Sequence, residues 1–195
     1  MDQARKGAWA VYDSKTKKLV HYGTYNFEYE TEQVKKKDGS YKTKRIRKYE
    51  YEEAIVLIEK LLMELINKYS IKMVFLEDVP VVRNSMAVKP LLRLQGALIA
   101  YLAKRKIPHE LIMPRTWQAA YRYKEKGAPS EIKKYKRYLD RTSPYKNLRP
   151  TKKASLLAVK ELFDMELDND DLADAILIGH YAVNNLKIKE KKGSK

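Results

Sequence analysis

Residues 170–182 read Asp170-Asp171-Leu172-Ala173-Asp174-Ala175-Ile176-Leu177-Ile178-Gly179-His180-Tyr181-Ala182, which sets three carboxylates at the start of an otherwise apolar helix. Side chains three residues apart share a helical face, so Asp171 and Asp174 point the same way, and an Asp170–Asp174 pair is also geometrically possible. Close, ionised carboxylates repel one another unless a cation lies between them. Hard oxygen ligands of this kind suit Mg²⁺ or Mn²⁺. The alternative interpretation is an acidic first turn that the helix dipole favours.

The composition limits the class of protein. At 195 residues the chain is long enough for one domain with a full core, and it contains no cysteine. Disulfides, thiolate catalysis and zinc held by sulfur are therefore excluded. No apolar run approaches the roughly 20 residues of a membrane span, and the N-terminus lacks the apolar core of a signal peptide. We therefore expect a soluble, cytoplasmic protein with no membrane partner.

The charge balance points to a polyanionic partner. Forty-one basic residues against 25 acidic ones give a formal charge of +16. Residues 34–48 hold eight lysines or arginines against one acid, residues 122–153 hold twelve against three, and residues 187–195 add five more. A solvated, lysine-rich surface is the alternative for each run. Three such runs around a carboxylate cluster favour a footprint on the phosphates of a nucleic acid.

The hydrophobic pattern predicts an α/β domain over residues 1–186 with a basic insertion at 34–48 and a basic, flexible tail at 187–195. A hairpin of strands comes first, and later strands alternate with helices, so a mixed sheet flanked by helices is expected. The predicted strands cover 8–12, 19–29, 73–76 and 110–113. The predicted helices cover 52–69, 85–105, 117–123, 130–139, 151–163 and 170–186.

Two further acids stand where such folds place their sites. Glu77 follows the apolar strand 73–76, and the ends of strands in an open α/β sheet carry its functional groups. Asp2 precedes a turn at Gly7 that leads into the strand 8–12. Taken alone, Glu77 also fits a solvated residue at a strand end.

In this order, the motifs resemble the RuvC family of Holliday-junction resolvases, in the RNase H-like nuclease superfamily. Asp2 before a small-residue turn, Glu77 after a buried strand and the D-x-x-D-A pattern of Asp171–Ala175 carry the resemblance, together with the helix sequence of Leu91–Ala97. The stretch Pro114-Arg115-Thr116-Trp117-Gln118 is similar to phage-type members. Family members have a whole strand before the first Asp, whereas Asp2 here follows Met1 directly, so the first strand is expected to be missing or truncated.

The resemblance implies a metal-dependent nuclease. Asp2, Glu77, Asp171 and Asp174 would hold two Mg²⁺ or Mn²⁺ ions, with Asp170 as the alternative to Asp171. Such a pair of ions activates water for in-line attack on a phosphodiester. Lys153 would contact the scissile phosphate, with the neighbouring Lys152 as the alternative.

The resemblance also implies a branched-DNA partner, a four-way junction, bound by a homodimer through the 85–105 helix, in a bacterium or a phage-infected bacterial host. His180 lies about 240° around the helix from Asp174, which favours a structural role. The residues expected to bind nucleic acid are Lys35, Lys36, Lys37, Lys44, Arg45, Arg47, Arg115, Arg122, Lys124 and Lys152. Two other functions stay open, an RNase H-like hydrolase of RNA–DNA hybrids and a junction-binding protein with weak or no catalysis.

Overall fold

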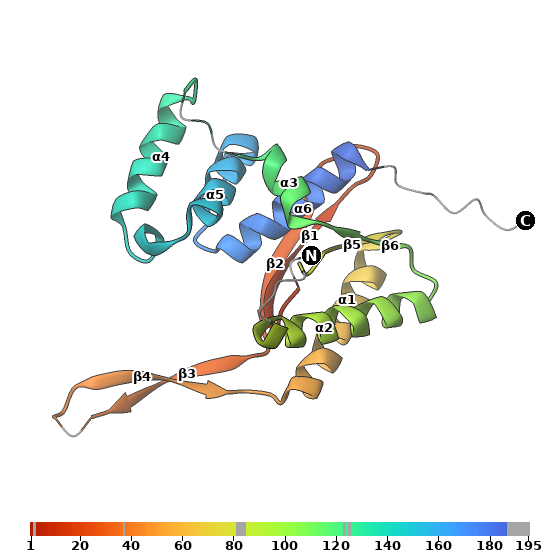
Figure 1. Ribbon diagram of the computed structural model, residues 1–195, viewed down its shortest axis with the longest axis horizontal. Coiled ribbons are helices and arrows are strands. Elements are labelled where there is room, and N and C mark those ends of the chain that lie inside the picture. Colours follow the sequence, from red (N-terminus) through yellow and green to blue (C-terminus); the bar gives the residue numbers. More distant parts are fainter. Residues whose placement is uncertain (2, 37, 81–84, 123, 125, 187–195) are drawn as a thin grey trace, which may run out of the picture.

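The computed structural model describes residues 1–195 except 2, 37, 81–84, 123, 125 and 187–195. Within these residues it is a mixed α/β structure, as the hydrophobic pattern predicted (Figure 1). The strands are β1 (Lys6–Tyr12), β2 (Leu19–Asn26), β3 (Tyr29–Lys35), β4 (Tyr41–Arg47), β5 (Val74–Glu77) and β6 (His109–Ile112). The helices are α1 (Tyr51–Tyr69), α2 (Ser85–Lys104), α3 (Pro114–Ala120), α4 (Ser130–Arg141), α5 (Pro150–Phe163) and α6 (Asp170–Asn185), with the 3-10 turn η1 at Tyr145–Asn147.

The strand directions follow the prediction, but the strands do not join into one sheet. β1 pairs antiparallel with β2, and β5 pairs parallel with β6 across the α2 crossover. In the part of the chain that the structure describes, the strands form three separate two-stranded ladders, of which β3–β4 is the third. The continuous mixed sheet expected from the sequence is therefore divided.

The N-terminal residue makes backbone hydrogen bonds to β5 at the place where β1 and β5 line one cavity. Met1 lies beside β5, where its amino group donates to the Phe75 carbonyl at 2.8 Å and its own carbonyl accepts from the Glu77 N–H at 3.2 Å. A cavity of about 340 Å³ lies next to this contact, lined from β1, α1, β5 and α6. β1 and β5 both line this cavity, and no backbone hydrogen bonds join them into one sheet in the described part of the chain.

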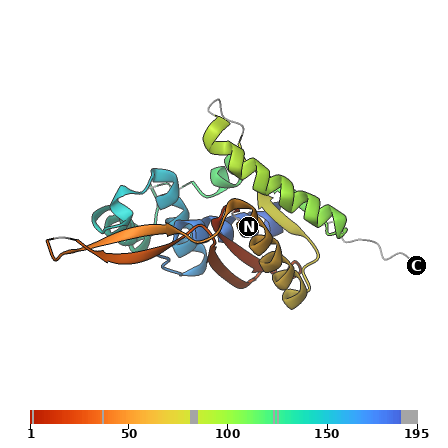
Figure 2. The same cartoon turned by 90° about the horizontal axis from the view of Figure 1, so that it is seen from below.

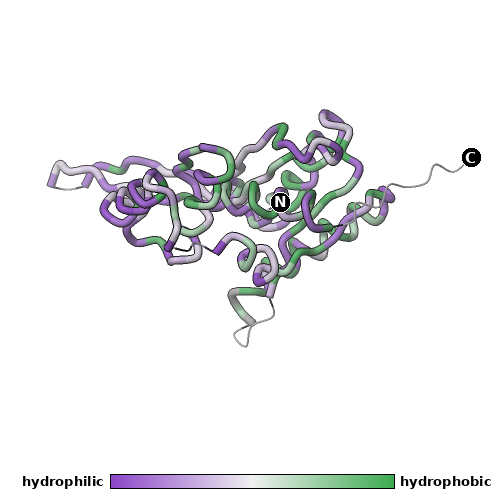
Figure 3. Tube along the Cα trace, turned by 90° about the horizontal axis from the view of Figure 1, so that it is seen from above, coloured by the Kyte–Doolittle hydropathy of each residue, from purple (hydrophilic) through white to green (hydrophobic). Residues whose placement is uncertain are grey.

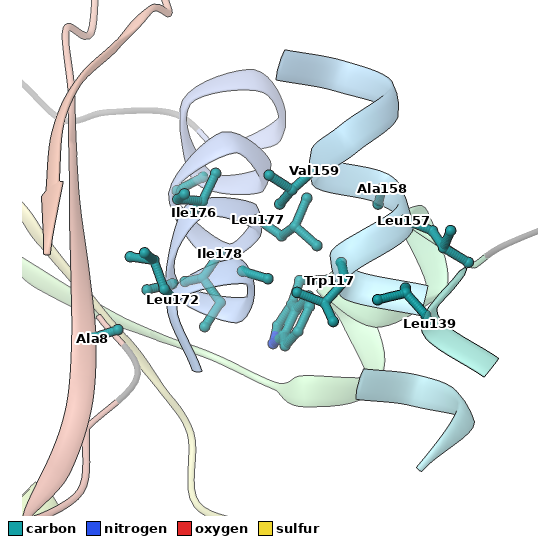
Figure 4. Close-up of a cluster of buried hydrophobic side chains, with 14 of the residues drawn as sticks. Ala8, Trp117, Leu139, Leu157, Ala158, Val159, Leu172, Ile176, Leu177 and Ile178 are labelled. Carbon is teal, nitrogen blue, oxygen red and sulfur yellow. The ribbon is translucent and has the colours of Figure 1, made fainter. Parts of the chain in front are cut away.

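Helix α6 is the centre of the larger hydrophobic core. Leu172, Ala173 and the run Ala175–Ile178 are buried against β1, α3, α4 and α5, and Trp117 of α3 is inserted among them (Figure 4). A helix that is apolar on nearly all sides must be enclosed by other elements. The acids at the start of α6 are thereby fixed to the core. A second core joins α1, α2 and β5 through Ile58, Leu76 and Leu98.

Several element boundaries differ from the prediction. The expected strand 19–29 ends at Asn26, whose side-chain oxygen accepts from the Glu28 N–H at 3.0 Å and so forms a turn. The basic run 34–48 then lies mostly in the β3–β4 hairpin, which extends away from the body in two perpendicular views (Figures 1 and 2). Helix α3 begins at Pro114 and not at Trp117, because proline suits the first helical position.

Among the described residues, no helix combines the length and apolar character needed to cross a membrane.

Candidate active site

Glu77 stands at the end of β5 and is held by three hydrogen bonds to two neighbours, Gln3 and Trp117. Its backbone N–H donates to the Gln3 side-chain oxygen at 3.0 Å, and the Gln3 amide donates back to the Glu77 carbonyl. Its carboxylate accepts from the indole N–H of Trp117 at 2.9 Å. Both Gln3 and Trp117 are buried. The carboxylate is therefore held in one orientation.

Asp174 lies one turn inside α6, whose start is capped by Asn169. The Asn169 side chain accepts from the Leu172 N–H at 3.0 Å. Asp174 is only 4% exposed, and its Oδ1 has no hydrogen-bond partner among the described residues. A buried carboxylate oxygen without a partner costs free energy, and such exceptions in a folded protein need an explanation.

One ammonium group compensates the acids at the start of α6. The Lys152 Nζ, from α5, lies 2.6 Å from Asp174 Oδ2, 3.1 Å from Asp170 Oδ2 and 3.5 Å from Asp171 Oδ1. The sequence left open which of Asp170 and Asp171 belongs with Asp174, and Lys152 brings both into one cluster. A single positive charge therefore faces three carboxylates.

Burial raises the pKa of both inner carboxyls. For Glu77, desolvation is the largest cause, and the charge of Asp174 raises the pKa further, while the Trp117 hydrogen bond lowers it. For Asp174, desolvation again raises the pKa, and the ion pair with Lys152 opposes it. Because the Asp174 charge raises the pKa of Glu77, the two carboxyls belong to one electrostatic site.

The structure distinguishes the two neighbouring lysines of α5. Lys153, which the resemblance placed at the scissile phosphate, instead donates to Asp140 Oδ1 at 2.7 Å and to the Lys146 carbonyl at 3.2 Å. Lys152, the alternative, is the lysine that reaches the acids. Successive helical residues point about 100° apart, so only one of the two can face α6.

The donor set suits a hard divalent cation. Glu77, which is half-buried, and Asp174, which is buried, supply carboxylate oxygens, and Asp174 Oδ1 makes no hydrogen bond of normal geometry within the described chain, although the Ser155 side chain lies near enough to lower the pKa of this carboxyl. Oxygen ligands with this charge are those that Mg²⁺ and Mn²⁺ prefer. No group of three or more His, Cys, Asp or Glu side chains in the described part of the chain is arranged to hold a metal ion. Asp2, the fourth predicted ligand, lies outside the described residues.

A basic hollow adjoins these acids. A cavity of about 310 Å³ is lined by Arg115, Trp117 and Arg122 from the α3 region and by Thr151 and Ser155 from α5. Trp117 is also the hydrogen-bond partner of Glu77. Trp117 is therefore common to the carboxylate site and to a hollow that two predicted nucleic-acid-binding arginines line.

The remaining predicted DNA contacts lie in two places. Lys124 follows α3 and is exposed. Lys37 lies outside the described residues. The others are exposed on or beside the β3–β4 hairpin, namely Lys35, Lys36, Lys44, Arg45 and Arg47.

Sequence reasoning missed two residues that support the site. Gln3 is adjacent to Asp2 in the sequence and was assigned no role, and Trp117 was named only within the stretch Pro114–Gln118. A buried glutamine next to a predicted metal ligand is the signal that could have identified Gln3. For His180 the structural interpretation agrees with its contacts, since its Nδ1 lies 2.7 Å from the Tyr121 hydroxyl and its ring packs edge-on against Phe163.

Comparisons with known proteins give likeness in structure only. No protein-family model matches the sequence, and no curated protein matches it significantly. A structure of Thermus thermophilus RuvC in complex with a Holliday junction substrate is similar at 14% identity and a TM-score of 0.47, over 73% of this chain and 76% of that one. Another Thermus thermophilus RuvC structure is similar at 13% identity and a TM-score of 0.46, over 91% of this chain and 92% of that one. Both TM-scores are below 0.5, so the function rests on the residues of this chain.

Proposed function

We propose that this protein is a Mg²⁺- or Mn²⁺-dependent endonuclease that cleaves branched DNA and resolves four-way junctions by paired phosphodiester hydrolysis. The observation that carries the proposal is the pair of desolvated carboxylates, the half-buried Glu77 and the buried Asp174, with Lys152 on Asp174 and one Asp174 oxygen without a hydrogen-bond partner in the described chain. Buried acids with raised pKa values are costly for folding alone and are typical of functional sites.

In this proposal the carboxylates hold the metal ions. Glu77 and Asp174 are the inner ligands, Asp171 or Asp170 completes the set from α6, and Asp2 is a further proposed ligand. When bound, divalent ions supply Lewis-acid activation of a water and stabilisation of the leaving oxygen.

The other residues position groups and balance charge. Trp117 and Gln3 keep the Glu77 carboxylate and backbone in place. Lys152, which is already on the acids, stabilises negative charge that develops on the reacting phosphate. Because one ammonium forms ion pairs with three carboxylates, it can exchange one of them for a phosphate oxygen and remain beside the site.

The basic surface binds the DNA backbone. Arg115 and Arg122 line the hollow beside Trp117, and Lys124 lies just beyond it in the chain. Lysine and arginine contacts to phosphates fix the position of a duplex without reading its sequence.

A homodimer fits the paired cleavage of a four-way junction. Helix α2 buries Leu94 and Leu98 in the body, while Met86 and Leu92 are 71% and 41% exposed. We take the exposed Leu92 side chain as part of the interface between two copies. Two copies related by a twofold axis would present two sites to two symmetric strands.

A specific observation favours a second candidate, a junction-binding protein with weak or no catalysis. The Lys152 ammonium forms ion pairs with all three acids at the start of α6 without a metal ion. If that arrangement persists in solution, binding survives chelation and no strand is cut.

The test is cleavage of a synthetic four-way junction in Mn²⁺, with linear duplex and RNA–DNA hybrid as separate substrates. Wild-type protein is compared with Glu77→Gln and with Glu161→Gln, a charge-matched control at an exposed position of α5. We expect paired nicks on the junction alone, lost in Glu77→Gln and kept in Glu161→Gln. Cleavage of the hybrid alone would make the protein a hybrid hydrolase. Tight binding without nicks would favour the second candidate.

A further inference from the structure

The β3–β4 hairpin has two chemically different faces. In its antiparallel register, Tyr29 opposes Arg47, Thr31 opposes Arg45, and the pairing continues to Lys35 opposite Tyr41. Directly opposed residues project from the same face, and successive residues along a strand alternate between faces. The register therefore assigns every side chain of the ladder to one side or the other.

We name the first side the arginine face. It carries three basic residues, no acid and no aliphatic side chain. Its members are Tyr29, Thr31, Gln33, Lys35, Tyr41, Thr43, Arg45 and Arg47.

The second side is the mixed face. Its two acids equal its two bases in number, and two aliphatic side chains complete it. Its members are Glu30, Glu32, Val34, Lys42, Lys44 and Ile46.

Burial does not account for this pattern. All residues of both strands are exposed except Tyr29, which is half-buried. The trace of the hairpin is mainly hydrophilic and stands apart from the apolar body (Figure 3). A hairpin that packs on a core has one apolar face. Here the distinction between the faces is one of charge, which indicates a charged partner.

Side-chain contacts order the arginine face. The Arg45 guanidinium lies 4.7 Å from the centre of the Tyr29 ring. Gln33 donates to the Thr43 hydroxyl at 3.1 Å, across the two strands. Arg47 reaches Glu50 at 3.3 Å, but both side chains are more than 60% exposed, so this ion pair is weak. The face thus presents partly preorganised donors.

We infer that the hairpin inserts its arginine face into the major groove of a DNA duplex arm. Seven paired positions span roughly 20 Å at about 3.4 Å per residue. The major groove is about 12 Å wide and admits a two-stranded β-ribbon. Arginine pairs with guanine and glutamine with adenine at base edges there, while lysine contacts phosphates.

The opposite face and the surroundings agree with this orientation. The glutamates of the mixed face would be repelled by phosphates, so this face turns outward. Helix α4, with Lys133, Lys134, Lys136 and Arg137, extends toward the same end of the molecule as the hairpin (Figures 1 and 2). The inference rests on the proposed function only in taking DNA as the partner. It also removes Lys44 from the binding face, contrary to the sequence-based expectation.

The first experiment compares two lysines that differ in face alone. Lys35→Gln removes one charge from the arginine face, and Lys42→Gln removes one from the mixed face, one step along the ladder. Binding of a labelled junction and of a linear duplex is measured by fluorescence anisotropy in EDTA over a range of salt. We expect Lys35→Gln to weaken binding about threefold or more and to lower the salt slope by about 0.9. Lys42→Gln should stay within about 1.5-fold of wild type. Equal losses for both variants would overturn the inference.

The second experiment identifies the groove. Dimethyl sulfate methylates guanine at N7, which lies in the major groove, and adenine at N3, which lies in the minor groove. We expect wild-type protein to protect N7 within one arm, and Arg45→Gln to lose that protection and to bind at least fivefold more weakly. Protection of N3 alone, or no difference between wild type and Arg45→Gln, would refute the proposal. Both experiments exclude metal, so a failure of junction cleavage does not affect their outcome.

Discussion

Gly179 of α6 lies directly against the ring of Tyr12. This contact predicts that Gly179→Ala destabilises the wild-type protein but stabilises a variant that lacks the Tyr12 ring. A β-carbon at position 179 would lie 2.6 Å from Tyr12 Cε2 and 2.7 Å from Cδ2, closer than carbon atoms approach without displacement. The ring cannot turn away freely, since its hydroxyl donates to the Ile176 carbonyl at 2.9 Å. Gly179→Ala must therefore move either the ring or the helix.

The free energies can be worked out from these contacts. Overpacking costs about 1–3 kcal/mol, and the loss of the Tyr12 hydrogen bond adds about 1 kcal/mol. Alanine in place of glycine in a helix interior returns about 1 kcal/mol. We expect Gly179→Ala to lower the free energy of unfolding by about 1–3 kcal/mol in the wild-type background. In a Tyr12→Ala background the obstacle is gone, and the same substitution should raise it by up to about 1 kcal/mol.

Urea denaturation followed by circular dichroism measures all four members of this cycle, with a coupling of about 2–4 kcal/mol expected. Tyr12→Phe provides the control, because it keeps the ring and removes only the hydroxyl, so Gly179→Ala should stay destabilising there. If Gly179→Ala destabilises the Tyr12→Ala protein as much as wild type, the packing of β1 on α6 is not as described.

Three further outcomes are expected. Folding raises the pKa of Glu77, so the ionised carboxylate destabilises the fold above that pKa, and this cost disappears as pH falls and the group is protonated. Glu77→Gln should therefore raise the melting temperature of the metal-free protein at pH 8, and the difference from wild type should shrink toward pH 4. Lys152→Met should reduce junction cleavage about 100-fold, and by more than Lys153→Met does, because Lys152 is the lysine on the acids. Leu92→Glu should convert a dimer into a monomer in analytical ultracentrifugation and change paired nicks into single ones.

The parts of the fold that the sequence predicted are those with a burial pattern. Helix α6 was predicted at 170–186 and is found at Asp170–Asn185, and the strand predicted at 73–76 is found at Val74–Glu77. The hairpin was expected only as a basic insertion at 34–48, since strands exposed on both faces leave no period of two in hydrophobicity. The division of the sheet was not expected, because the sequence does not show whether β1 and β5 lie close enough to form hydrogen bonds.

The candidate site shows the same limit. Glu77, Asp171 and Asp174 were named from spacing and order, and whether they bind metal stays a prediction. The choice between Lys152 and Lys153 could not be made from sequence, because it depends on how α5 is rotated against α6. Trp117, named from the sequence only within the stretch Pro114–Gln118, is 1% exposed in the core, and its indole N–H donates to Glu77. A residue can thus serve packing and the site at once, and composition alone does not reveal the second role.

The position of Lys152 links stability to function. In the metal-free protein it balances acids that would otherwise repel one another, and Asp174 Oδ1 still has no partner within the described chain. A divalent cation held by Glu77 and Asp174 would compensate their negative charge more strongly than Lys152 does. The Lys152 ammonium would then be available to a phosphate. Removing Lys152 should therefore weaken the metal-free fold and cleavage together, while Mn²⁺ raises the melting temperature of Lys152→Met by more than that of wild type. In a junction-binding protein that uses Lys152 only as a counterion, Lys152→Met would weaken the metal-free fold, but Mn²⁺ would not raise its melting temperature. The two proposed functions therefore differ in a melting experiment that requires no cleavage.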